Sequence, residues 1–187
     1  MELDKAIEKR HSSRKFKLTK KPDYREVIDA IDAATKIPLA GNLPALKFIL
    51  VLDQEKIKKL AQAADQDFIE TAPYVIVICS DKKFLQKSYY KRADMYSRQQ
   101  AGAAVEHILL KLTDLGIDNC WIGAFSDITV KNLLKIPDDV DVEAMIPCGY
   151  EIGKQWTERR RKPALDRCLY FDTYKNRFMK PRRAPSD

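Results

Sequence analysis

The chain has 187 residues, of which 45% are hydrophobic and 33% charged, a composition typical of one globular domain with a substantial core. No apolar run approaches the roughly 20 residues of a membrane span, and residues 1–5 lack the apolar stretch of a secretory signal, so neither is expected. The net charge of +7 fits an anionic ligand. Nucleic acid is a poor candidate, because zinc-finger spacing, RNP-like aromatics and a helix-turn-helix signal are all missing.

Cysteine usage points to a reducing compartment. The four cysteines are Cys79, Cys120, Cys148 and Cys168, and no two form a CxxC pair. Three of them stand in apolar, strand-like segments, where a buried free thiol is the usual state. With only two histidines in the chain, we expect a cytoplasmic protein without a metal site.

The first half of the chain predicts alternating helices and strands. In order these are a helix at 2–10, a helix capped by Asp23 with Glu26 in a capping-box-like position, a strand at 48–52, a helix capped by Asp53 and a strand at 74–79. Both strands are continuous apolar runs, which predicts cover on both faces. Residues 37–44 hold two prolines, a glycine and an asparagine, and are predicted to form an irregular loop.

The second half contains the longest predicted helix, in which apolar residues recur at helical spacing from Ala101 to Leu115 before a Gly116 C-cap. This helix is either the core of a monomer or the centre of a dimer interface. Residues 81–98 mix basic and aromatic side chains with weak periodicity, so they form either a lid or a solvated connection. The remaining predictions are a strand at 119–122, a helix starting at Asp127 or Thr129, a strand at 144–150 and a short final strand at 169–171.

Two cationic clusters lie far apart in the sequence. Residues 10–16 read Arg-His-Ser-Ser-Arg-Lys-Phe, and residues 159–163 read Arg-Arg-Arg-Lys-Pro. Guanidinium groups and hydroxyls match the geometry of a phosphate. The first cluster alone could equally be a solvated basic turn, but two such clusters are what a phosphate pocket needs.

Five segments in order resemble the FMN-dependent nitroreductase family, over about residues 2–172. They are residues 10–16, the loop at 37–45, the Leu-Gly helix end at 115–116 with the Trp-Ile-Gly-x-Phe strand end at 121–125, the Pro-x-Gly-Tyr element at 147–150, and the basic segment at 159–163. The resemblance implies an α+β fold with a central mixed, mainly antiparallel sheet flanked by helices. It also implies a long central helix at a homodimer interface, with one domain at 1–175 and a basic tail at 176–187.

The resemblance further implies how FMN is held between the two chains. Arg10, Ser12, Arg159 and Arg161 would grip the phosphate, and His11 would touch the phosphate or ribityl chain. Arg14 would lie at the N1 and O2 edge of the flavin, where a cation stabilises the reduced form. Gly123 and Ala124, after Trp121 and Ile122, would present backbone near N5. Pro38, Leu39, Ala40 and Asn42 would come from the partner subunit.

The family's Gln-Pro-Trp sequence is replaced here by Leu-Pro-Ala at 43–45, and its Asn-x-x-Lys element has no counterpart at 65–70. The contacts of the 43–45 segment therefore differ from the family's, and more of the electrostatic task falls to Arg14. Candidate substrate contacts are the four aromatic residues Phe84, Tyr89, Tyr90 and Tyr96.

The implied function is an oxidoreductase in which NAD(P)H reduces FMN and a small aromatic acceptor, a nitroaromatic or quinone, is then reduced by a ping-pong mechanism. No side chain is expected to act as acid, base or nucleophile, because the flavin carries the hydride. A GxGxxG fingerprint is missing, so the nicotinamide would share the flavin site. The alternatives are a flavoenzyme of the same fold with dehalogenating or oxygen-dependent chemistry, and a non-enzymatic flavin-binding or basic nucleic-acid-binding protein.

Overall fold

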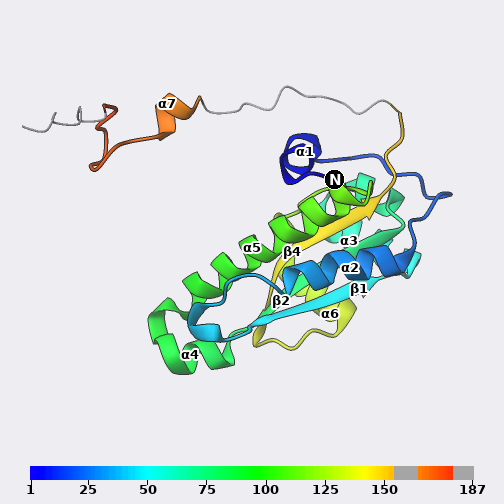
Figure 1. Ribbon diagram of the computed structural model, residues 1–187. Helices are drawn as coiled ribbons and strands as arrows, with labels where there is room; N and C mark the ends of the chain where they lie inside the picture. Colours follow the sequence, from blue (N-terminus) through cyan, green and yellow to red (C-terminus); the bar gives the residue numbers. More distant parts are fainter. Residues whose placement is uncertain (154–163, 179–187) are drawn as a thin grey trace, which may run out of the picture. The chain divides into compact units, whose positions relative to one another are not determined.

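The computed structural model describes residues 1–153 and 164–178 (Figure 1). The chain divides into two compact units, Met1–Gln155 and Trp156–Asp187. The first unit contains the sheet and most of the helices, and the second contains α7 (Leu165–Cys168). None of the helices in the described residues combines the length and apolar character needed to cross a membrane. The single domain predicted for 1–175 stays a prediction.

The sheet of the first unit has four strands in the order β1 (Leu46–Val51), β2 (Tyr74–Asp81), β4 (Val140–Gly149) and β3 (Asp118–Asn119). Every neighbouring pair is antiparallel. Among the described residues, the one parallel pairing is an isolated bridge between Ser12 and Asn119, which adds the N-terminal segment to the β3 edge. The α+β prediction with a mainly antiparallel sheet is thus confirmed.

Helices cover both faces of the sheet, because alternate strand residues point to opposite sides. On one face Ile76, Ile78 and Ile146 pack against α2 (Tyr24–Ala34) and α5 (Ala93–Asp114). On the other face Val75, Val77 and Met145 pack towards α3 (Gln54–Ala64) and α6 (Asp127–Leu134). The prediction of two covered faces holds for β2, which is buried from Tyr74 to Ser80. For β1, an edge strand, the cover is partial: Phe48 and Leu50 pack against one cluster and Ile49 against the other, but most of the strand is only partly buried.

The long helix begins eight residues earlier than expected. Helix α5 starts at Ala93 rather than Ala101, after α4 (Lys83–Tyr89) and η3 (Tyr90–Arg92). Its first two turns do bury one face, but through the small or polar residues Ala93, Ser97 and Gln100. A search for apolar periodicity therefore misses these turns, although their spacing is helical.

Helix starts follow local side-chain chemistry. Helix α1 (Leu3–Lys9) forms as predicted, and the Asp23 and Asp53 carboxylates accept backbone N–H bonds at the starts of α2 and α3. Helix α6 begins at Asp127, one of the two predicted starts, and its N-cap is Ser126, whose hydroxyl accepts from the Thr129 N–H. Two short 3-10 helices, η1 (Ala40–Asn42) and η2 (Asp67–Thr71), complete the connections.

The predicted final strand at 169–171, which would cross to another subunit, is not formed within the described residues of one chain, and its pairing with a partner stays a prediction. These residues follow α7 without strand pairing. The Phe171 N–H donates to the Asn176 carbonyl, and the rings of Tyr170 and Tyr174 pack edge to face at 5.0 Å. The segment thus closes a local turn instead of extending a sheet.

Gly149 provides a test of packing at the end of β4. An added Cβ there would lie 2.5 Å from Pro73 Cδ and 2.9 Å from its Cγ, in a buried site. Gly149→Ala should therefore lower the free energy of unfolding by about 1–3 kcal/mol, measured by urea denaturation. Gly102→Ala in α5 is the control, since its Cβ meets nothing within 4 Å and alanine favours a helix. Equal losses in the two variants would contradict this account.

Candidate functional site

The basic segment at 10–16 is held along the edge of the sheet. The Ser13 N–H donates to the Asn119 carbonyl at 2.9 Å, which places the segment beside β3. Farther along, Phe16 pairs with Glu151 and is 1% exposed, so its ring anchors the end of the segment in the core. The sheet thus extends the segment and fixes which way its side chains point.

Alternate residues of this segment face Cys120. Burial raises the pKa of the Cys120 thiol, while the charge of Arg14, a hydrogen bond from Ser12 and the charge of Arg10 act in the opposite direction. These three side chains therefore lie close to Cys120, the residue directly before the Trp-Ile-Gly sequence at 121–123. Ser12 and Arg14 are exposed and Arg10 is partly so, which leaves their polar groups available to an anion.

The residues after Cys120 present backbone to solvent. Ile122 is buried and pairs with Met145 in β4, whereas Trp121 is 45% exposed and Gly123 and Ala124 are exposed. Among the described residues, neither the Gly123 nor the Ala124 N–H has a backbone acceptor. A Cβ added to Gly123 would meet only Trp121 Nε1, at 4.0 Å, so the fold itself does not require glycine here.

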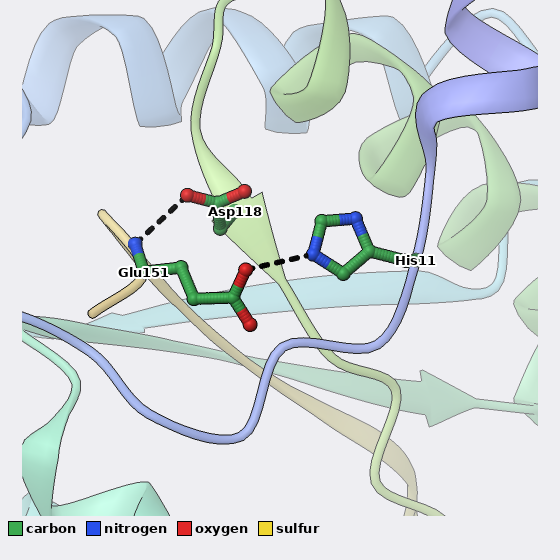
Figure 2. Close-up of side chains that lie close together, drawn as sticks. All are labelled: His11, Asp118 and Glu151. Carbon is green, nitrogen blue, oxygen red and sulfur yellow. Dashed lines mark hydrogen bonds and ion pairs between the residues drawn. The ribbon is translucent and has the colours of Figure 1, made fainter. Parts of the chain in front are cut away.

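His11 does not join this group. It lies on the other side of the extended segment, where its Nε2 is 3.0 Å from Glu151 Oε2 and 3.0 Å from Ser13 Oγ. The Glu151 N–H donates to Asp118 Oδ2 at 2.8 Å (Figure 2). Burial raises the pKa of Asp118, the hydrogen bond from the Glu151 N–H opposes this, and the charge of Glu151 raises the pKa while that of His11 lowers it.

Sequence reasoning missed Asp118 and Glu151, because they are 33 residues apart and meet only through strand pairing. A local signal was present nonetheless. Each is an acidic residue beside an end of a predicted strand, where the turn brings polar side chains together.

The predicted loop and aromatic residues form a second group. In η1, Gly41 and Asn42 both adopt φ near 58°, and a Cβ on Gly41 would lie 2.3 Å from Tyr89 Oη. The Tyr89 ring packs edge to face on Tyr96 at 4.9 Å. Tyr89 and Tyr96 thus support the loop, whereas Phe84 and Tyr90 are 62% and 79% exposed.

The departure from Gln-Pro-Trp has a local explanation. Leu43 and Ala45 pack against Leu85 and Ala93, and the Leu43 carbonyl accepts from Gln100 Nε2 at 3.3 Å. Small apolar residues at 43 and 45 therefore fit the loop against α4 and the start of α5.

Helix α5 separates the two groups. Asp114 at its end pairs with the Met1 ammonium, next to α1, while its first turns hold the 38–43 loop. A 22-residue helix is roughly 33 Å long, and Figure 1 shows α1 and α4 at its opposite ends. One chain therefore does not bring Pro38, Leu39, Ala40 and Asn42 next to Arg10, Ser12 and Arg14. Arg159 and Arg161 lie outside the described residues.

Gly123 can be tested separately from packing. Gly123→Ala should keep its free energy of unfolding within about 0.5 kcal/mol of the parent, because the added methyl group enters open space in this chain. Thermal or urea denaturation measures this. A loss as large as that expected for Gly149→Ala would show instead that the fold needs a glycine at 123.

Known proteins resemble this chain over most of its length. The sequence profile of the Nitroreductase family matches residues 7–68 and 61–150. A provisionally named NADH dehydrogenase/NAD(P)H nitroreductase of Archaeoglobus fulgidus is 34% identical over 125 residues, covering 64% of this chain and 69% of that protein.

Two solved structures share the fold. A nitroreductase family protein of Clostridium novyi is 28% identical, with a TM-score of 0.74 over 94% of this chain and 96% of that one. An FMN-dependent nitroreductase of Clostridium difficile is 25% identical, with a TM-score of 0.76 over 90% and 98%. The chain therefore belongs to the nitroreductase family.

Proposed function

We propose that this chain is a flavoprotein oxidoreductase that binds FMN and uses NADH or NADPH to reduce a small aromatic acceptor of the nitroaromatic or quinone type. The observation that carries the proposal is that Arg10, Ser12 and Arg14 gather near Cys120, a few residues before the exposed Gly123 and Ala124. The similarity to an FMN-dependent nitroreductase and to an NAD(P)H nitroreductase supports it. All four cysteines are free, which supports a place in the reducing cytoplasm.

The residues present fit FMN. Its phosphate carries a charge near −2, and Arg10 with the Ser12 hydroxyl offers a cation and a donor on one side of an extended segment. The amides of Gly123 and Ala124 are free of backbone acceptors, so they can donate to polar atoms of the flavin ring. FMN would supply the redox chemistry, taking a hydride from NAD(P)H and passing electrons to the acceptor.

Arg14 has a role distinct from that of Arg10. It follows Ser12 by two residues on the same side of the extended segment, and its charge acts on Cys120 more strongly than that of Arg10. A guanidinium beside N1 and O2 stabilises the negative charge of the reduced ring. The protein then contributes binding, orientation and charge, and donor and acceptor occupy the same site in turn.

A homodimer would complete the site. Within one chain the cationic segment and the Pro38–Asn42 loop lie at opposite ends of α5. In a two-fold dimer the loop of one protomer can approach the cationic segment of its partner, and symmetry then makes two equal sites. This arrangement would explain why a loop with two left-handed residues is held so firmly by Tyr89.

The absorbance spectrum of the purified protein tests the function. The expected result is the two-band spectrum of oxidised flavin, bleached by anaerobic NADH or NADPH and restored by a quinone. Protein that stays colourless after incubation with FMN would overturn the proposal.

Two arginine variants separate binding from tuning. Arg10→Ala should lose FMN, because the phosphate loses its cation. Arg14→Ala should retain more FMN but reduce it more slowly, measured by stopped-flow bleaching. Equal loss of FMN in both, with normal reduction of any flavin that Arg14→Ala keeps, would contradict the division of roles.

Mixed dimers test the shared site. Arg10→Glu and Asn42→Leu should each be inactive alone. In a shared site, Arg10 comes from one protomer and Asn42 from its partner. A hybrid dimer of the two variants then has one site with both substitutions and one site with neither. Random subunit exchange should then restore about a quarter of the parent activity. Activity no higher than that of the separate variants would show that each chain builds its own site.

A further inference from the structure

Beneath the cationic segment lies a small pocket that the proposed function does not use. Its volume is about 190 Å³, and it is lined by residues of α1, the end of α5 and the 116–119 segment, with His11 and Asp118 among them. Nδ1 or Nε2 of His11 and one carboxylate oxygen each of Asp118 and Glu151 lie within 4.8 Å of one another. All three residues are partly buried.

The hydrogen bonds of His11 define the state of its ring. Nδ1 lies 3.0 Å from the Lys9 carbonyl, which can only accept, so Nδ1 carries a proton. In the neutral ring Nε2 then has a lone pair, as in a histidine prepared to bind a metal. Yet Nε2 faces Glu151 Oε2 at 3.0 Å. Two lone pairs do not approach this closely unless a proton or a metal ion lies between or beside them.

Asn119 adds a second, independent observation. It lines the same pocket and is 1% exposed. Its Nδ2 group has three acceptors, the Leu109 and Ile117 carbonyls and Thr113 Oγ1. Its Oδ1 is buried and has no hydrogen-bond partner among the described residues. A buried oxygen without a donor is what a nearby cation would satisfy.

We propose that one divalent transition-metal ion of the zinc type binds at the edge of this pocket, between His11 Nε2, the Asp118 carboxylate and the nearby Glu151 carboxylate. Imidazole with carboxylates suits zinc. Ligand atoms around a tetrahedral zinc lie roughly 3.4 Å apart, given bonds of about 2.0–2.2 Å. Small side-chain rotations would bring the three atoms to that spacing, and water could complete the shell.

The ion would join three segments that are distant in sequence: the chain after α1, strand β3 and the residue after β4. It lies on the side of residues 10–14 opposite Arg10, Ser12 and Arg14, so it would brace the segment without contacting FMN. The proposal is therefore independent of the proposed function, and it goes against the expectation, drawn from two histidines, that no metal is bound.

Zinc titration of the full chain tests the site. The protein carries Cys168→Ser, because that thiol is exposed and could bind zinc. After treatment with a chelator and dialysis, calorimetry should show one ion per chain, and Zn²⁺ should raise the melting temperature. His11→Ala and Glu151→Gln should each weaken binding by at least about tenfold. His107→Ala is the matched control, since it removes the only other histidine, and should bind like the parent.

Glu151→Gln keeps the side-chain volume and the backbone N–H bond to Asp118, so it reports on the site even if His11→Ala folds poorly. Unchanged affinity in Glu151→Gln would place the ion elsewhere and overturn the proposal. The absence of saturable binding to the parent would overturn it as well, and would leave a proton shared by His11 and Glu151.

Discussion

The backbone pairing of the N-terminal segment with β3 is the constraint on which the rest of the site depends. The hydrogen bond from the Ser13 N–H to the Asn119 carbonyl, together with the pairing of Phe16 with Glu151, extends the residues after α1 along the edge of the sheet. The buried Phe16 ring prevents the segment from sliding, because a shift by one residue would expose it. Six basic and polar residues, 10–15, thereby acquire a defined direction.

The extended backbone separates two kinds of chemistry within one short sequence. Side chains at even positions, from Arg10 to Arg14, gather near Cys120. His11 and Ser13 point to the other side and meet Glu151. A helix at this place would have mixed the two sets around its circumference, since its period is 3.6 rather than 2. The cationic side chains that would bind an anion and the histidine–carboxylate cluster can therefore coexist within residues 10–14.

Helix α5 acts as a spacer. Its end contacts α1 and β3, and its beginning contacts α4 and the loop before β1. The helix packs on α2 and on the buried strands, so its length and position are set by the core rather than by the site. Evolution of loop residues at one end can then proceed without disturbing the cationic segment at the other. The replacement of the family's Gln-Pro-Trp by Leu-Pro-Ala, accommodated by local packing against α4, fits this separation.

Much of the fold could be predicted from local patterns. The apolar runs of β2 and β4 and the Asp23 and Asp53 caps identify elements because strand propensity and capping act within a few residues. The start of α5 could not be found in this way, because its buried face consists of small and polar residues that only neighbouring elements explain. The edge position of β1 likewise depends on strand order, which no local pattern contains.

For the site, the sequence determined which groups are available: the guanidiniums and hydroxyls at 10–14 and the glycine at 123. Tertiary structure alone decided how they are divided. It directed His11 away from Arg10 and Arg14, and it brought Asp118 and Glu151 together across strand pairing. Tertiary packing also gave Tyr89, which was predicted to contact substrate, a structural role, because its side chain supports the Gly41 turn. The physical reason is that side-chain direction depends on backbone pairing and packing between distant segments, whereas residue chemistry is present in the chain before it folds.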